Sequence, residues 1–165
     1  MNWIINFFNT KLLEINMDSN ISNFSGSIAT QLLREEHRNT YNILIEYENG
    51  KINDEKFIEH IDFLLSHHFP IEEKILFPAF EPFLKIYLPY IEPIKMVLAE
   101  HNGVRNLFRK YNESKNNDFL KQIKDLLLQH IYREENGLFK QIDTFLPEDK
   151  KEEVFFKINH FSMEK

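Results

Sequence analysis

The stretch HFPIEEKILF at residues 68–77 recurs as HIYREENGLF at residues 130–139, and both copies fit the pattern HxxxEExxLF. Each copy follows a second shared pattern, EHxxxxN, which begins at Glu36 and again at Glu100. The histidines of the two patterns are 31 residues apart in the first copy and 29 in the second. Because both copies keep the same order and nearly the same interval, the sequence indicates an internal duplication of a helical hairpin.

Long stretches with helical apolar periodicity lie between few glycines and prolines, and no strand-like alternation of useful length is found. Asn49-Gly50 is a typical helix stop, and Asn53 is a typical N-cap. The expected helices are about 3–15, Ser27–Glu48, Asp54–Phe77, Pro93–Tyr111, Asp118–Phe145 and Pro147–His160. We therefore predict an all-α fold. Residues 27–165 form an antiparallel four-helix bundle with a short C-terminal helix, preceded at residues 1–26 by an apolar N-terminal extension helix and a linker.

Four prolines, Pro78, Pro82, Pro89 and Pro93, fall in one short window. A proline has no backbone amide to donate, and its ring meets the preceding turn, so it is disfavoured inside a helix. We therefore interpret this window as the connection between the two copies rather than as the interior of a helix.

The composition excludes several classes of protein. At 165 residues and 42% hydrophobic residues, the chain is long enough for one domain with a real core. A net charge of −6 without a basic stripe argues against a nucleic-acid partner. The absence of cysteine excludes disulfides, thiolate zinc sites and iron–sulfur clusters, so a metal would be held by nitrogen and oxygen. No stretch approaches the roughly 20 apolar residues of a membrane span, and the N-terminus lacks the features of a signal peptide, so we expect a cytoplasmic protein.

The repeated histidines have apolar residues three, four or seven positions away, which places them on the inward faces of their helices. Each HxxxE motif adds a glutamate one turn later on the same face. A buried carboxylate is unfavourable unless it is paired or bound to a metal. Four imidazoles and two carboxylates on facing helices suit two metal ions with each carboxylate bridging both. The predicted metal ligands are His37, His68, Glu72, His101, His130 and Glu134.

Other acidic residues and histidines serve as comparisons. Glu73 and Glu135 have no histidine four positions earlier, so we expect them to support the ligands from outside the cluster or to lie on the surface. The remaining histidines, which we interpret as structural or solvated, are His60, His67 and His160.

The four motifs EEHRNTYNIL, HHFPIEEKILFPAF, AEHNGVRNLF and HIYREENGLF resemble the hemerythrin-like family, also called HHE cation-binding domains, over about residues 29–145. The resemblance implies a bundle with a non-haem di-iron centre. Its two irons would be bridged by the two carboxylates and by an oxo or hydroxo group. Members of the family bind dioxygen, handle peroxide or nitric oxide, or sense oxygen or iron.

Two positions depart from the oxygen-carrying hemerythrins. Those carriers have a second histidine one turn after the third-helix histidine, where this chain has Arg105, and they end with HxxxxD rather than HxxxE. One imidazole fewer leaves the second iron more open to exogenous ligands. The departure therefore favours a sensor or a redox protein over reversible carriage.

Two residues near the ligands have open roles. Tyr41, one turn after His37, is a candidate further ligand, a hydrogen-bond donor to bound oxygen, or a packing residue. Pro70 removes the amide that would bond to Ser66 and should bend the second helix. Such a bend either aims the ligands or shifts Glu72 away from the metal.

We expect a non-haem di-iron protein that binds or reacts with dioxygen, peroxide or nitric oxide. The alternative is a metal-dependent oxygen or iron sensor, or an interaction module, without turnover. A third hypothesis is a metal-free bundle descended from such a protein. Zinc or manganese can occupy the same nitrogen and oxygen ligands as iron.

Overall fold

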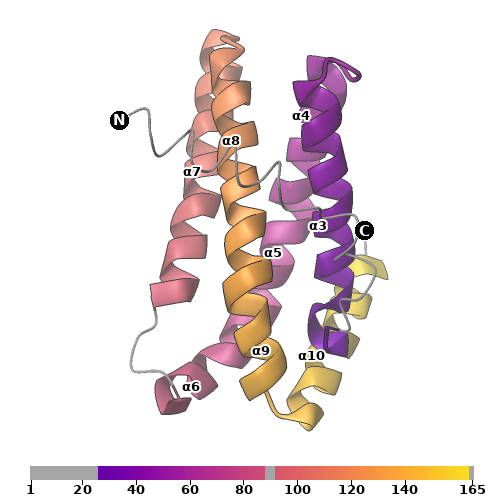
Figure 1. The fold of residues 1–165 in the computed structure, drawn as a ribbon, viewed down its shortest axis with the longest axis vertical. Coiled ribbons are helices and arrows are strands. Elements are labelled where there is room, and N and C mark those ends of the chain that lie inside the picture. The colour runs from indigo at the N-terminus through magenta and orange to yellow at the C-terminus, as the bar shows by residue number, and fades with distance from the viewer. Residues whose placement is uncertain (1–25, 88–91, 164–165) are drawn as a thin grey trace.

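Four helical columns run along the long axis of the molecule and alternate in direction (Figure 1). The computed structural model describes residues 26–87 and 92–163, and all regular elements in these ranges are helices. The columns are α3 (Ile28–Glu48); α4 (Asp54–Phe63), η2 (Leu64–His68), α5 (Phe69–Ile71), η3 (Glu72–Leu76) and α6 (Phe77–Tyr87); α7 (Glu92–Ser114); and α8 (Asp118–Arg133), η4 (Glu134–Leu138) and α9 (Phe139–Phe145). A final helix, α10 (Glu148–Met163), packs against α3. The prediction of an all-α helical bundle is confirmed, whereas the predicted segment 1–26 lies outside the described residues except for Gly26.

Local signals in the sequence set three of the helix ends in the described residues. Gly50 has a φ of +66°, a conformation that glycine adopts without strain, and it ends the turn after α3. The Asn53 side chain accepts a hydrogen bond from the Lys56 amide at 3.0 Å and caps α4. The Pro147 carbonyl accepts hydrogen bonds from the amides of Lys150 and Lys151 at the start of α10.

The prediction that the second helix ends near Phe77 is wrong, because the column continues to Tyr87 with Pro82 inside α6. Pro70 and Pro78 each lie two residues after a π-helical turn, η2 and η3 respectively. A π turn holds one more residue than an α turn, which gives a following proline ring more room beside the preceding turn. The π turns therefore accommodate Pro70 and Pro78 in this column, whereas Pro82 lies inside α6 without such a turn.

The hydrophobic core consists of two clusters separated along the bundle. On α3, Leu33 belongs to the first cluster and Leu44 to the second. Val97 and Val104 on α7 are divided between the clusters in the same way. The inward polar residues occupy the stretch of bundle between these two apolar clusters, so both clusters shield them from water.

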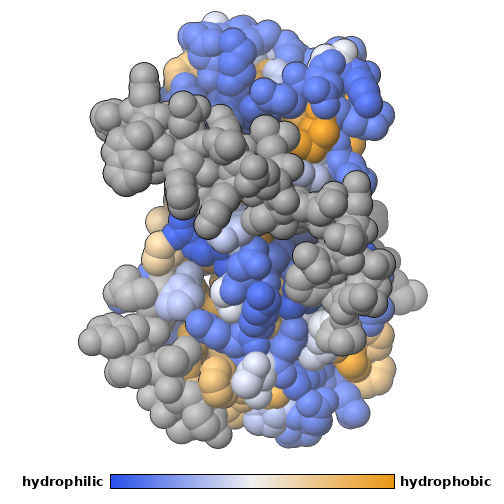
Figure 2. Space-filling view, viewed as in Figure 1, coloured by the Kyte–Doolittle hydropathy of each residue, from blue (hydrophilic) through white to orange (hydrophobic). Residues whose placement is uncertain are grey.

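The outer surface agrees with this inward arrangement of apolar side chains. On the face seen in Figure 2, the described surface is mainly hydrophilic, with small separate hydrophobic areas. None of the helices in ranges 26–87 and 92–163 is long and apolar enough to cross a membrane.

Candidate metal centre

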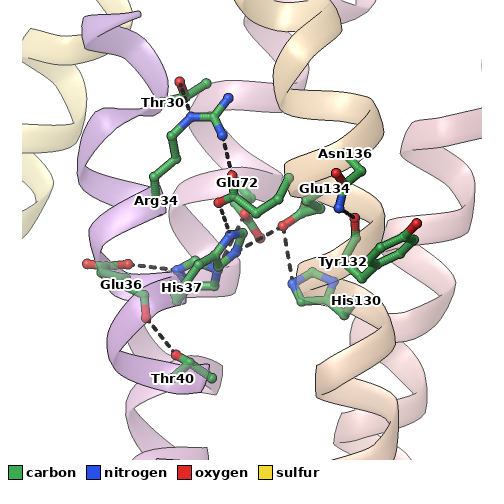
Figure 3. A network of polar contacts seen from close by, with 12 residues as sticks. Thr30, Arg34, Glu36, His37, Thr40, Glu72, His130, Tyr132, Glu134 and Asn136 are labelled. Carbon is green, nitrogen blue, oxygen red and sulfur yellow. Dashed lines mark hydrogen bonds and ion pairs between the residues drawn. The ribbon is translucent and has the colours of Figure 1, made fainter. Parts of the chain in front are cut away.

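All six predicted ligands lie inside the bundle and face one another. None has more than 2% of its surface exposed. Figure 3 shows His37, Glu72, His130 and Glu134 converging from three of the four columns, and His101 enters from α7. The ligand atoms of five residues, all except His101, lie within 4.8 Å of one another. Five of the six predicted residues thus form one spatial group, and their binding of metal stays a prediction.

The four histidines form two pairs. The Nε2 atoms of His37 and His68 are 3.2 Å apart, close enough for one ion to contact both, and we call them the first pair. The rings of His101 and His130 have centroids 4.9 Å apart, and we call them the second pair.

Both buried glutamates lie between the two pairs. Glu72 places Oε1 3.4 Å from Nε2 of His68 and Oε2 3.2 Å from Nε2 of His101. Glu134 places Oε2 3.1 Å from Nε2 of His37 and 3.3 Å from Nε2 of His130. Each carboxylate therefore reaches one histidine of the first pair and one of the second, as a bridging ligand requires.

A π-helical turn begins at each of these glutamates. The Phe77 amide donates to the carbonyl of Glu72 in η3, and the Phe139 amide donates to the carbonyl of Glu134 in η4, in each case over five residues. The second copy has no proline near this turn. The π turn is thus a feature of the repeat rather than an effect of proline. Pro70 does not displace Glu72, which remains fully buried beside His68.

The cluster contains buried polar atoms that hydrogen bonds leave unsatisfied. Both carboxylate oxygens of Glu72, both of Glu134, and the Nε2 atoms of His101 and His130 are buried without a hydrogen-bond partner in the described residues. A buried polar atom without a partner costs about 1–3 kcal/mol, and more when it is charged. Because all these atoms face one another, a metal-ion centre fits the donor set and would satisfy them together.

Each histidine has a second carboxylate on its Nδ1 side. Three of the four distances are short: Glu135 to His37 at 2.8 Å, Glu36 to His68 at 2.7 Å and Glu73 to His101 at 2.8 Å; Glu100 lies 3.5 Å from His130. A carboxylate at Nδ1 keeps the proton there and leaves the Nε2 lone pair for a metal. Three of the outer carboxylates, Glu135, Glu36 and Glu73, therefore orient their imidazoles, whereas Glu100 only lies near His130.

A basic side chain in turn contacts each outer carboxylate. Arg34 pairs with Glu135 and also with Asp143. The other contacts are His67 Nε2 to Glu36 at 3.3 Å, Arg105 to Glu73 at 2.8 Å and Arg133 to Glu100 at 2.9 Å. Arg105, which stands where the carriers have a further histidine, thus contacts an outer carboxylate.

Phenylalanines form the apolar walls of the centre. Phe139 stacks on His37 with ring centroids 5.1 Å apart, and Phe77, its counterpart in the first copy, stacks on His101 at 6.3 Å. Phe69 stacks more closely on His101, at 3.8 Å. The repeated final phenylalanine of HxxxEExxLF therefore packs against the EHxxxxN histidine of the other copy.

Burial and charge set the protonation of the cluster. Burial lowers the pKa of His68 and of His101 to about 4, which keeps both imidazoles neutral as ligands must be. Burial alone would also lower the pKa of His37, but Glu134 and Glu135 outweigh it and raise the value to about 9. Burial and the charge of Glu134 raise the pKa of Glu72 well above its usual range. Metal ions and protons therefore compete for this cluster.

The comparison residues take outer positions. His60 is buried, and its Nε2 lies 3.0 Å from the Thr40 hydroxyl, which agrees with a structural histidine. His67 contacts Glu36 rather than the cluster. Tyr41 is half-buried against the second apolar cluster, and its role as a ligand or hydrogen-bond donor stays a prediction.

The sequence interpretation missed Glu36 and Glu100 as functional residues. The signal was present, because a glutamate precedes His37 and another precedes His101. Adjacent residues do not share a helix face, so each of these glutamates contacts a histidine of a neighbouring column instead.

Comparison with known proteins gives one match. The family model described as the hemerythrin HHE cation-binding domain matches residues 28–142, a range that contains all six clustered residues. No match to the chain is found among curated proteins or solved structures.

Proposed function

The chain belongs to the hemerythrin HHE cation-binding family, and from that premise we propose that its buried cluster holds two iron ions and reacts with or binds dioxygen, peroxide or nitric oxide. The observation that carries the proposal is the position of Glu72. Its two oxygens face histidines of different pairs, at 3.4 and 3.2 Å. A single-ion site would not need a carboxylate between two imidazole pairs.

The proposed ligands divide evenly. His37 and His68 would hold one ion and His101 and His130 the other, with Glu72 and Glu134 bridging both. When bound, the two ions would supply electrons and open coordination positions for a small ligand.

The remaining residues prepare the cluster for this chemistry. Three of the outer carboxylates would hold the Nδ1 protons of His37, His68 and His101 and turn their Nε2 atoms toward the centre. The phenylalanine walls and the two apolar clusters keep bulk water away, which strengthens electrostatic interactions inside. Iron, zinc and manganese all suit nitrogen and oxygen ligands. The choice of iron is therefore part of the proposal.

The test is to load metal-free protein with ferrous iron under anaerobic conditions and record absorption spectra before and after adding dioxygen, hydrogen peroxide or nitric oxide. We expect about two irons per chain and a spectral change with at least one of these molecules. His68→Ala should lose that change, and His160→Ala, a histidine outside the cluster, should retain it. Failure to bind iron, or a two-iron protein indifferent to all three molecules, would contradict the proposal.

A sensor without turnover is the second candidate, and one network favours it. Asp143 accepts hydrogen bonds from the Ser27 amide and hydroxyl at 3.1 and 2.6 Å and pairs with Arg34. Arg34 also pairs with Glu135, which contacts His37. The first described residues of the bundle are thus linked to a proposed ligand. For a sensor we expect chelation to speed amide exchange at the start of α3 and no catalytic turnover.

A further inference from the structure

We propose that the two metal positions are unequal: the second pair fills last and exchanges its ion, and Arg105 sets the affinity of that position through Glu73. This inference rests on the proposed dinuclear centre and adds which half of it is labile. Three separate features of the structure support it.

The first feature is the exposure of the outer basic side chains. Beside the first pair, the side chain of Arg34 is 7% exposed and that of His67 is 15% exposed. Beside the second pair, Arg105 is 36% and Arg133 is 35% exposed. A polar contact open to water is weaker and more easily broken than a buried one. The support of the second pair is therefore the looser one, and water reaches it more readily.

The second feature is the hydrogen bonding of the imidazoles themselves. Both histidines of the first pair have a carboxylate within 2.8 Å of Nδ1. In the second pair only His101 does, because Glu100 lies 3.5 Å from His130 and both ring nitrogens of His130 lack a hydrogen bond. A ligand that is not held in place must be ordered when the metal binds, which lowers affinity. The first pair is therefore better organised for a metal.

The third feature is the contact of Arg105 with both supports of His101. Oε1 of Glu73 accepts from Arg105 at 2.8 Å and lies 2.8 Å from Nδ1 of His101. The Arg105 guanidinium also lies over the Phe69 ring, 5.7 Å from its centroid, and that ring stacks on His101. Without the guanidinium, Glu73 would lose the partner that keeps it against His101. Arg105 is thus a positioning residue for the second pair.

The test uses Co²⁺ titration of metal-free protein, followed by calorimetry and by the cobalt absorption bands. In the wild type we expect two binding steps, the second weaker than the first. Loss of an outer contact typically lowers metal affinity about 10- to 100-fold. Arg105→Met keeps the aliphatic stem and removes the partner of Glu73 rather than Glu73 itself, so it should weaken the second step by up to about tenfold and leave the first step unchanged.

Two further variants separate position from charge. Arg109→Met removes an exposed arginine one turn later, whose partner is Glu113 on the same helix, and both steps should stay unchanged. Arg105→Lys should restore part of the second step, because a lysine keeps the charge but not the planar fork.

The assignment of the steps is checked with the ligands. His101→Ala should abolish the weak step and retain the tight one, whereas His68→Ala should lose the tight step. Circular dichroism checks that each variant is folded. If His101→Ala is unfolded, His101→Gln is used in its place. Two equal steps in the wild type, or an equal effect of Arg105→Met on both steps, overturn the inference. A wild type that binds no Co²⁺ and no iron instead overturns the proposed function.

Discussion

Replacing Arg34 by methionine should destabilise the metal-free bundle by about 3 kcal/mol. The side chain is 7% exposed and pairs with Glu135 and Asp143, which are 14% and 21% exposed. Removing one partner of a buried ion pair costs about 3–5 kcal/mol, because a buried charge is left uncompensated. We take the lower end, since Asp143 keeps its hydrogen bonds from Ser27. Methionine retains the packing of the aliphatic stem, so the loss reports mainly the missing charge.

Chemical denaturation followed by far-ultraviolet circular dichroism measures this loss, and thermal unfolding should shift down by roughly 6–12 °C. Arg109→Met is the matched control, because its pair with Glu113 is exposed and joins residues one helical turn apart. Such a pair contributes about 0.3–0.5 kcal/mol. If the two variants lose the same amount, below about 1 kcal/mol, the buried network of Arg34 does not stabilise the bundle and the argument is refuted.

Three further predictions test the cluster. Glu72→Gln should stabilise the metal-free protein while lowering metal content below two per chain, because burial and a neighbouring carboxylate make its charge unfavourable; denaturation paired with metal analysis checks both. Burial lowers the pKa of His60 to about 4. Between pH 6.5 and 4, His60 therefore binds a proton in the unfolded chain but not in the folded one. Up to about 3 kcal/mol of stability is then lost as pH falls from 6.5 toward 4. His60→Gln should remove this contribution, while those of His68 and His101, whose pKa is also about 4, stay. His68→Ala or His130→Ala should reduce metal content below two per chain, whereas His67→Ala should not; an equal loss in His67→Ala would show that the helix register is misassigned.

The meeting of these side chains inside the bundle could be predicted because it depends on spacing alone. A histidine and a glutamate four residues apart share a helix face, and a duplicated order brings the two copies together across the bundle. Some helix ends could also be predicted from short-range signals, such as Gly50 after α3 and the Asn53 cap of α4. These features need no knowledge of how the columns pack.

The outer shell of the centre could not be predicted in the same way. Which carboxylate contacts which imidazole depends on the relative rotation of neighbouring columns, and adjacent residues on one helix give no information about that. Glu36 contacts His68 and Glu135 contacts His37, and in each case the two residues lie on different columns. Pro78 was misinterpreted for a related reason, because the π turn before it changes the backbone that the proline rule assumes. The π turn does not explain Pro82, which lies inside α6.

The most direct test of the central claim is a crystal structure of iron-loaded protein with anomalous diffraction measured at the iron edge. The account predicts two peaks about 3.5–4 Å apart, one beside His37 and His68 and the other beside His101 and His130, with Glu72 and Glu134 between them. A single peak, or iron bound outside these six residues, would contradict it.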